Sequence, residues 1–155
     1  MKPTLRIIVS LAAAALMAPA APVLARPAAA KAAVHPASGL PVIGLKIRGH
    51  AFRVEVARTG AEQQKGLMFR TAMKPNEGML FPEDRPRQVA FWMRNTVLPL
   101  DIVFIGPDRR ILNIVNAIPY DETPLPSAGP ATAVLELNAG RTKALGIRVG
   151  DRVEW

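Results

Sequence analysis

The chain has 155 residues, with 20 Lys and Arg against 12 Asp and Glu, a formal net charge of +8 and no cysteine. Its basic residues are scattered singly apart from Arg109-Arg110, and few residues are aromatic, so a nucleic-acid partner is not expected. No disulfide can form, so stability has to come from apolar burial. From residue 41 onward the chain is long enough for one domain with one core and too short for two.

Residues 1–25 have the pattern of a secretory signal peptide, in which Lys2 and Arg6 precede an apolar run and Val23-Leu24-Ala25 forms a cleavage site. Residues 26–40 are predicted to be a flexible Ala/Pro-rich tether, because they have few large apolar side chains to offset the entropy of ordering. Cleavage places the protein in the periplasm or outside the cell. Without cleavage, the apolar run is almost long enough to anchor the chain in the inner membrane.

Short alternating segments separated by turn residues make up the predicted domain at 41–155. In chain order we expect a hairpin of 45–48 and 52–56, a helix from the capping box at 59–62 to about residue 68, strands at 79–81, 88–94, 98–105, 110–118 and 133–137, a helical turn or two at 139–145, and a strand at 152–155. Residues 83–87 and 119–130 are predicted loops. Strands outnumber helices, so we predict a mainly β single domain, a sandwich or partly open, jelly-roll-like barrel with one or two short helices.

The segment from Phe91 to Thr96, followed by Pro99-Leu100-Asp101, has the greatest chemical variety in the chain. Strand periodicity places Trp92 and Arg94 on one side, with their two neighbours on the other. An indole can stack on a sugar ring or a cation, and a guanidinium can bind a carboxylate or phosphate. One side of this segment is therefore expected to join the core and the other to line a cleft.

A structural interpretation of the same residues stays open. In it, Trp92 belongs to the core and Arg94 pairs with Asp101 or Glu77 to hold two strands together. Asp101 begins an apolar strand and needs a donor if it is buried. The candidates are Arg70, Arg94, Asn95 and Thr96. A buried pair of this kind more often stabilises strand register than performs chemistry. Glu136 is interpreted in the same way, with a solvent-facing position on its alternating strand as the alternative.

No complete catalytic constellation is present, and no catalytic residue, cofactor or metal ligand is assigned. Cysteine is absent, and neither His35 nor His50 lies in a motif suited to nucleophilic catalysis. Two alternatives remain. Asp101 with Glu77 or Glu136 could serve a carboxylate-dependent glycan-acting enzyme. The thioethers of four methionines could bind Cu(I), although methionine more often fills gaps in a core: Met68, Met73, Met79 and Met93.

Several sequence blocks occur together in one order: Gly66-Leu67-Met68-Phe69-Arg70, Gly78-Met79-Leu80-Phe81, Phe91 to Thr96, Pro99-Leu100-Asp101, Val134-Leu135-Glu136-Leu137 with Gly140, and Gly150-Asp151. In this order and spacing they resemble the family known as domain of unknown function 192, over residues 52–153. The resemblance implies a compact all-β domain, often behind an export signal or membrane anchor. It implies no reaction and no cofactor.

The sequence therefore predicts an exported, non-catalytic binding module for an anionic or polyhydroxylated ligand, such as a glycan, or for a partner in the cell envelope. The predicted ligand-binding residues are Arg70, Trp92, Arg94, Asn95 and Asp101. The loop at 121–130, with Ser127, is expected to form the rim of the site. The remaining alternative is a structural or interaction scaffold of the envelope with no small-molecule site.

Overall fold

The structure, a computed structural model, describes residues 33–155. The predicted signal peptide and the first part of the predicted tether, residues 26–32, lie outside the described residues. The described strands and helices are β1 (Val42–Ile47), β2 (His50–Val56), α1 (Gly60–Lys65), β3 (Glu77–Arg87), β4 (Ala90–Phe91), β5 (Leu100–Ile105), β6 (Ile111–Ala117), β7 (Leu125–Pro126), β8 (Ala131–Asn138), α2 (Arg141–Ala144) and β9 (Val153–Glu154). Within the described part of the chain, neither helix is long and apolar enough to cross a membrane.

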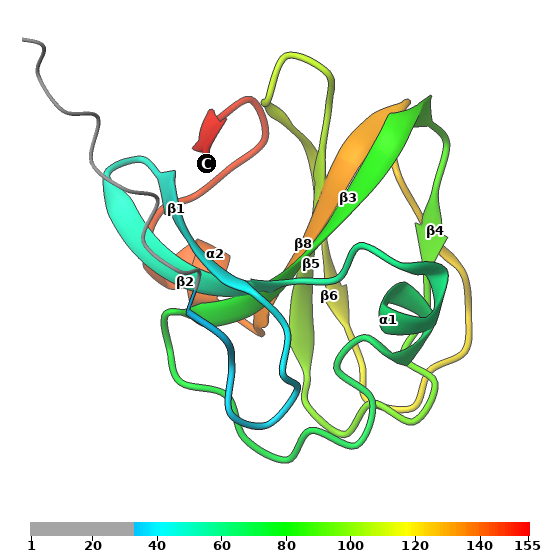
Figure 1. Cartoon of the computed structure of the whole chain (residues 1–155). Coiled ribbons are helices and arrows are strands. Elements are labelled where there is room, and N and C mark those ends of the chain that lie inside the picture. The colour runs from blue at the N-terminus through cyan, green and yellow to red at the C-terminus, as the bar shows by residue number, and fades with distance from the viewer. Residues whose placement is uncertain (1–32) are drawn as a thin grey trace, which may run out of the picture. The chain divides into compact units, whose positions relative to one another are not determined.

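Seven strands form one curled, mixed sheet in the order β6-β5-β8-β3-β2-β1-β9 (Figure 1). The β2–β3 pair is parallel, whereas the other neighbours in the sheet are antiparallel. A second, two-stranded sheet joins β4 to β7. In Figure 1, α1 lies on the same side of the molecule as β4. This arrangement confirms the predicted mainly β fold with a partly open, barrel-like sheet and two short helices.

Two apolar clusters follow from the alternation of side chains along the strands. On β8, Leu135 and Leu137 belong to one cluster, and Val134 belongs to the other. Strand β8 lies between β3 and β5, and of its eight residues from Ala131 to Asn138 six are buried and two are half-buried. Any polar side chain at an interior position of β8 is therefore removed from water.

Four predicted elements differ from the observed ones. The predicted loop at 119–130 contains the two residues of β7, which pair with β4. Strand β3 continues past Pro82 into the predicted charged loop, because a register shift against β8 between Pro82 and Arg87 accommodates the proline. The predicted strand at 88–94 is reduced to the two residues of β4. Helix α1 ends at Lys65 rather than near Met68, because Gly66 takes a positive φ of 44° and closes the helix.

The last residues of the predicted tether are part of the described fold. Val34 forms an isolated bridge with Pro41, and the amide of Val42 donates to the carbonyl of Ala33 at 2.7 Å. The Ser38 hydroxyl donates a hydrogen bond to the Glu55 carboxylate. Residues 33–40 thus contact β1 through the backbone and β2 through a side chain, which composition alone does not indicate.

Candidate functional site

The segment after β4 turns sharply and presents two side chains outward. The Met93 amide donates to the Asp121 carbonyl at 2.8 Å, and the Thr96 amide donates to the Met93 carbonyl at 3.1 Å, with Asn95 at a positive φ of 53°. Met93 is fully buried in the core, whereas Trp92 is 50% exposed and Arg94 is exposed. The predicted alternation is confirmed, although most of the segment is a turn and not a strand.

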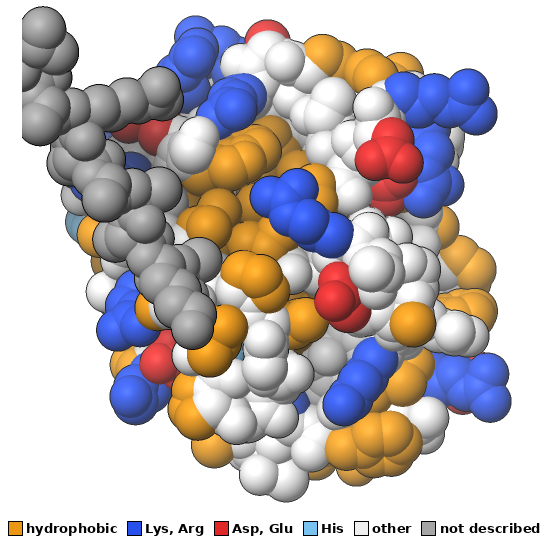
Figure 2. Space-filling view, in the orientation of Figure 1, with side chains coloured by type: hydrophobic (Ala, Val, Ile, Leu, Met, Phe, Trp, Pro, Cys, Tyr) orange, Lys and Arg blue, Asp and Glu red, His pale blue; other side chains and the backbone are white. Residues whose placement is uncertain are grey.

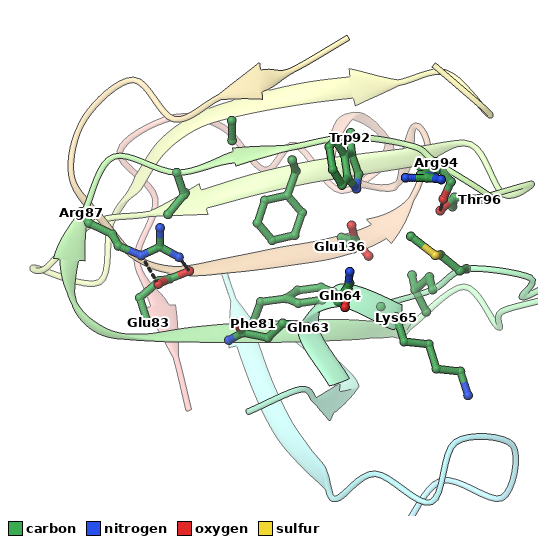
Figure 3. A pocket seen from close by; sticks show the side chains of 16 residues that line it. Gln63, Gln64, Lys65, Phe81, Glu83, Arg87, Trp92, Arg94, Thr96 and Glu136 are labelled. Atoms are coloured by element: carbon green, nitrogen blue, oxygen red, sulfur yellow. Dashed lines mark hydrogen bonds and ion pairs between the residues drawn. The ribbon is translucent and has the colours of Figure 1, made fainter. Parts of the chain in front are cut away.

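Helix α1 lies opposite this turn and forms the other wall. Its start is the predicted capping box, in which Thr59 accepts from the Glu62 amide and the Glu62 carboxylate accepts from the Thr59 amide. The Gln63 side chain donates to the Pro82 carbonyl at 2.9 Å, which ties α1 to β3. Gln64 and Lys65 remain exposed on the helix and border the space below Trp92 (Figure 3).

Glu136 lies between these two walls, in the middle of β8 (Figure 3). Its partners on the neighbouring strands are Met79 and Ile102, and both are fully buried in the core. Only 5% of Glu136 is exposed, and its Oε2 atom has no hydrogen-bond partner among the described residues. Burial raises the pKa of this carboxyl from 4.5 to about 8, because the ionised form has lost its hydration. At neutral pH the group is therefore mostly a neutral acid.

The walls and Glu136 enclose a pocket of about 220 Å³. An adjoining groove of about 400 Å³ extends from it toward Asn95 and shares its lining residues Gln64, Lys65, Met68, Trp92 and Arg94. The floor combines the Glu136 carboxyl with the edges of Phe81 and Phe91, whose rings meet edge to face at 5.0 Å. Polar and apolar groups contribute about equally to this lining, so a ligand that fills it needs both an apolar face and polar groups.

The charges around this pocket are unequal. Glu83 and Arg87, which also line it, neutralise each other through paired hydrogen bonds, one of 3.0 Å between Nη2 and Oε1. Lys65 and Arg94 are both exposed at the mouth. With Glu136 protonated, the mouth is positive and the floor is neutral, an arrangement that suits a ligand with an anionic group.

Gly78 determines how closely β3 approaches the Glu136 backbone. A Cβ atom at this position would lie 2.4 Å from the Glu136 carbonyl oxygen and 2.8 Å from the Leu137 side chain. The glycine is therefore required by the close approach of two backbones. It holds the central part of β8, and with it the pocket floor, against β3.

The predicted ligand-binding residues are divided among different places. Trp92 and Arg94 line the pocket, and Asn95 lines the adjoining groove. Arg70 lies in a separate hollow beside residues 37–40, where its Nη1 and Nη2 atoms donate to Glu55 at 2.9 and 3.0 Å. Asp101 lines neither hollow, because it is fully buried on β5.

Asp101 caps helix α2. Its Oδ1 atom accepts from the Gly140 amide at 2.9 Å, and its Oδ2 atom accepts from the amide and hydroxyl of Thr142 at 2.9 and 2.7 Å. Asn116 on β6 donates to the same carboxylate. None of these three donors is a partner expected from sequence. The interpretation of Asp101 as a structural tie is the one that its contacts favour.

The structure also places Ser127, the predicted rim residue, and the four methionines that were considered as Cu(I) ligands. Ser127 is buried, and its hydroxyl accepts from the Val89 amide at 3.1 Å, so it fastens its loop beside β4 and does not line the pocket. Of the four methionines, Met79 and Met93 are fully buried, Met73 packs against the same cluster, and Met68 borders the pocket. Among residues 33–155, no group of three or more His, Cys, Asp and Glu side chains is arranged to hold a metal ion.

Sequence reasoning missed Glu136 as the residue at the centre of the pocket. The alternation of Val134 to Leu137 predicts one face buried and one face in water, and this pattern places a glutamate on the wet face. On a central strand with both faces covered, the same alternation only distributes side chains between two cores. The one available signal was that Glu136 interrupts a nearly continuous apolar run, with residues 133–135 before it and Leu137 after it, as in a fully buried strand.

The fold and the site together define a class: a small, curled β domain whose central strand presents a buried acid to a pocket beneath a tryptophan. The chain belongs to the DUF192 family (uncharacterized ACR), whose profile matches residues 43–155. A protein of unknown function from Novosphingobium aromaticivorans DSM 12444 is 58% identical, with a TM-score of 0.78 over 82% of this chain and 94% of that one. A protein from Sinorhizobium meliloti 1021, proposed to be a transcription regulator, is 43% identical, with a TM-score of 0.70 over 72% and 91%. No curated protein matches the chain.

Proposed function

We propose that this domain is an exported binding module whose pocket takes an acidic glycan, that is, a polyhydroxylated ligand with an anionic group. The observation that carries the proposal is the unpartnered Oε2 atom of Glu136. Leaving a buried polar atom without a partner costs about 1–3 kcal/mol, so a polar ligand that supplies the partner gains correspondingly. A sugar hydroxyl can accept from the neutral acid or donate to it.

The other groups of the pocket suit the same ligand. Half of the Trp92 surface is exposed over the pocket, where an indole offers a flat face for a sugar ring. Arg94 and Lys65 at the mouth are within the same lining and favour a carboxylate on the sugar. The adjoining groove toward Asn95 provides room for a further sugar of the chain.

The proposal includes export, with cleavage of residues 1–25 and a periplasmic or extracellular location, or anchoring at the inner membrane if the segment is retained. Fractionation of cells producing the full chain, with mass measurement of the mature protein, tests this part. A mature N-terminus at Arg26 is the expected result. An uncleaved protein in the cytoplasmic fraction would exclude export.

The binding experiment compares two probes by isothermal titration calorimetry: bacterial cell-wall glycan strands, whose muramyl sugars carry a carboxylate, and neutral N-acetylglucosamine oligomers. We expect the acidic strands to bind more tightly. Arg94→Ala should weaken their binding about 10- to 100-fold, since a hydrogen bond to a charged group contributes about 1.5–3 kcal/mol. Arg148→Ala removes an exposed arginine from outside the pocket lining and serves as the matched control.

A second outcome would favour the scaffold alternative. If neither probe binds, or if Arg94→Ala and Arg148→Ala behave alike, the pocket is not an acidic-glycan site. If Arg94→Ala instead unfolds the protein, Arg94 is a structural residue, although no ion pair of its guanidinium is found among the described residues. Circular dichroism of each variant distinguishes these cases.

A further inference from the structure

We propose that the pocket also cleaves its bound glycan, with the Glu136 carboxyl as the single group that donates a proton to the glycosidic oxygen and afterwards accepts one. This inference rests on the proposed function, because the glycan has to bind before it can react. It also goes further, since the module expected from the sequence is non-catalytic.

The first step of the argument is the number of free acids at the pocket. Among its lining residues only Glu83 and Glu136 carry carboxyl groups, and Glu83 is held by Arg87 through both oxygens. Asp101, the sequence candidate for a second carboxylate, is occupied by the start of α2. Ordinary glycoside hydrolysis needs two working carboxyl groups on either side of the bond. This pocket supplies one.

The second step is the chemical state of that one acid. A general acid has to keep its proton near the operating pH, and enzymes achieve this by placing a glutamate among apolar groups. Glu136 has such surroundings, since Met79, Ile102 and the pocket-lining Phe91 are its neighbours on the strands and in the pocket. The raised pKa of its carboxyl has the same cause. Lys65 and Arg94 are the charged groups at the mouth, and the Glu83–Arg87 pair is neutral overall.

The third step is the reaction that one carboxyl can complete. Glu136 gives its proton to the bridging oxygen, the bond from the anomeric carbon to that oxygen breaks, and the leaving sugar departs with a new hydroxyl. The 6-hydroxyl of the remaining sugar attacks its own anomeric carbon, and its proton passes to the Glu136 carboxylate. One bond is lost and one is formed, no water is consumed, and the acid is restored.

Two features of the pocket agree with an internal nucleophile. Glu136 lines the pocket but is only 5% exposed, so few water molecules can surround its carboxyl while a sugar occupies the pocket. Trp92 lies over the pocket, as Figure 3 shows, and its ring face can stabilise the positive charge that develops at the anomeric carbon. The product is a glycan fragment that ends in an anhydro sugar.

The experiment incubates the full chain with the cell-wall glycan strands used for binding, whose sugars have a free 6-hydroxyl, and analyses fragments by mass spectrometry. We expect new ends that are one water lighter than hydrolysis products. Glu136→Gln keeps the shape of the side chain and should lower the rate about 100- to 10,000-fold while binding persists. Glu154→Gln changes an exposed acid on β9, away from the pocket lining, and should leave the rate unchanged.

Each other result overturns the inference in a recognisable way. Ordinary reducing ends would show that water is the nucleophile, so that a second catalytic group exists. Strands that bind but stay intact would leave the proposed function standing and remove the reaction. Equal cleavage by wild type and Glu136→Gln would exclude Glu136 as the proton donor. Absence of binding would remove both proposals together.

Discussion

Glu55 and Glu136 are both buried glutamates on neighbouring parts of one sheet, yet their surroundings are opposite. Glu55 on β2 is 3% exposed and accepts from Arg70 at 2.9 and 3.0 Å and from Ser38, with His35 at 3.6 Å. Glu136 on β8 is 5% exposed and its Oε2 atom has no partner within residues 33–155. A buried carboxyl with every oxygen engaged holds the fold together, whereas one left unpaired lowers stability and remains available to a ligand.

Asp101 extends the comparison to a third buried acid. It is fully enclosed like Glu136, but four hydrogen bonds from α2 and β6 engage its two oxygens. Burial by itself therefore does not separate structural from functional acids in this protein. The presence or absence of donors does so, and the four predictions below test that distinction.

The largest effect on stability is expected when the buried Glu55 carboxylate loses its partner Arg70. Arg70→Met leaves the Glu55 carboxylate buried with Ser38 and His35 alone, and removing one member of a buried pair costs about 3–5 kcal/mol. Urea unfolding gives the free energy of unfolding. The double variant with Glu55→Gln is the control and should recover much of the loss. A single-variant cost under about 1 kcal/mol would mean that the Arg70–Glu55 pair contributes no more to stability than a surface ion pair does.

Replacing Glu136, whose Oε2 atom has no partner among the described residues, is expected to raise stability instead. Glu136→Leu replaces a buried carboxyl with an apolar side chain among Met79 and Ile102, and should raise the free energy of unfolding by about 1–3 kcal/mol. The same denaturant titration measures it, with Glu55→Leu as the matched control, which should lower stability. Glycan binding should disappear in Glu136→Leu. A destabilised variant would show that Glu136 has a structural partner after all.

A change of one pH unit is expected to have a smaller effect than either substitution. The folded protein keeps the Glu136 proton up to a pKa of about 8, whereas the unfolded chain releases it near 4.5. Unfolding then releases a proton between these values, so the free energy of unfolding falls as pH rises, by up to about 1.4 kcal/mol per pH unit from this group. Comparing the slope of the free energy of unfolding against pH in the wild type and in Glu136→Leu isolates the contribution of this carboxyl. Equal pH slopes in the two proteins would contradict the raised pKa.

The smallest effect on stability is expected at Trp92. Because half of its surface is exposed, Trp92→Ala should change the free energy of unfolding by less than about 0.5 kcal/mol while weakening glycan binding. Its neighbour Met93 is fully buried, and Met93→Ala should cost about 2–5 kcal/mol. Thermal unfolding of the two variants side by side tests this. A large loss in Trp92→Ala would return Trp92 to the core interpretation.

The net charge of +8 is not gathered in one basic patch on the face shown in Figure 2. Lys and Arg side chains in Figure 2 are spread over the visible face among white and orange groups. Their scatter on this face agrees with the scatter along the chain. An anionic ligand is therefore expected to be bound by local pairs such as Lys65 and Arg94 at the pocket mouth, and less by a broad basic surface.

Local features were predictable because each depends on residues close together in the chain. The hairpin of β1 and β2, the capping box of α1 and the opposite directions of Trp92 and Met93 all follow from short-range spacing. The length of β3 was underestimated, because its continuation past Pro82 depends on a register shift against β8. The partners of Asp101 were missed for the same reason, since Asn116 and Thr142 come from other elements.

By itself the sequence determined a mainly β domain of the DUF192 family, with a tryptophan and an arginine directed to one side of the same segment. Only the tertiary structure decided which acids have partners. Strands β3 and β5 cover both sides of β8 and remove Glu136 from water, while α2 folds back to supply donors to Asp101 and none to Glu136. Desolvation and hydrogen bonding depend on neighbours brought together in space, and a pattern read along one strand does not contain them.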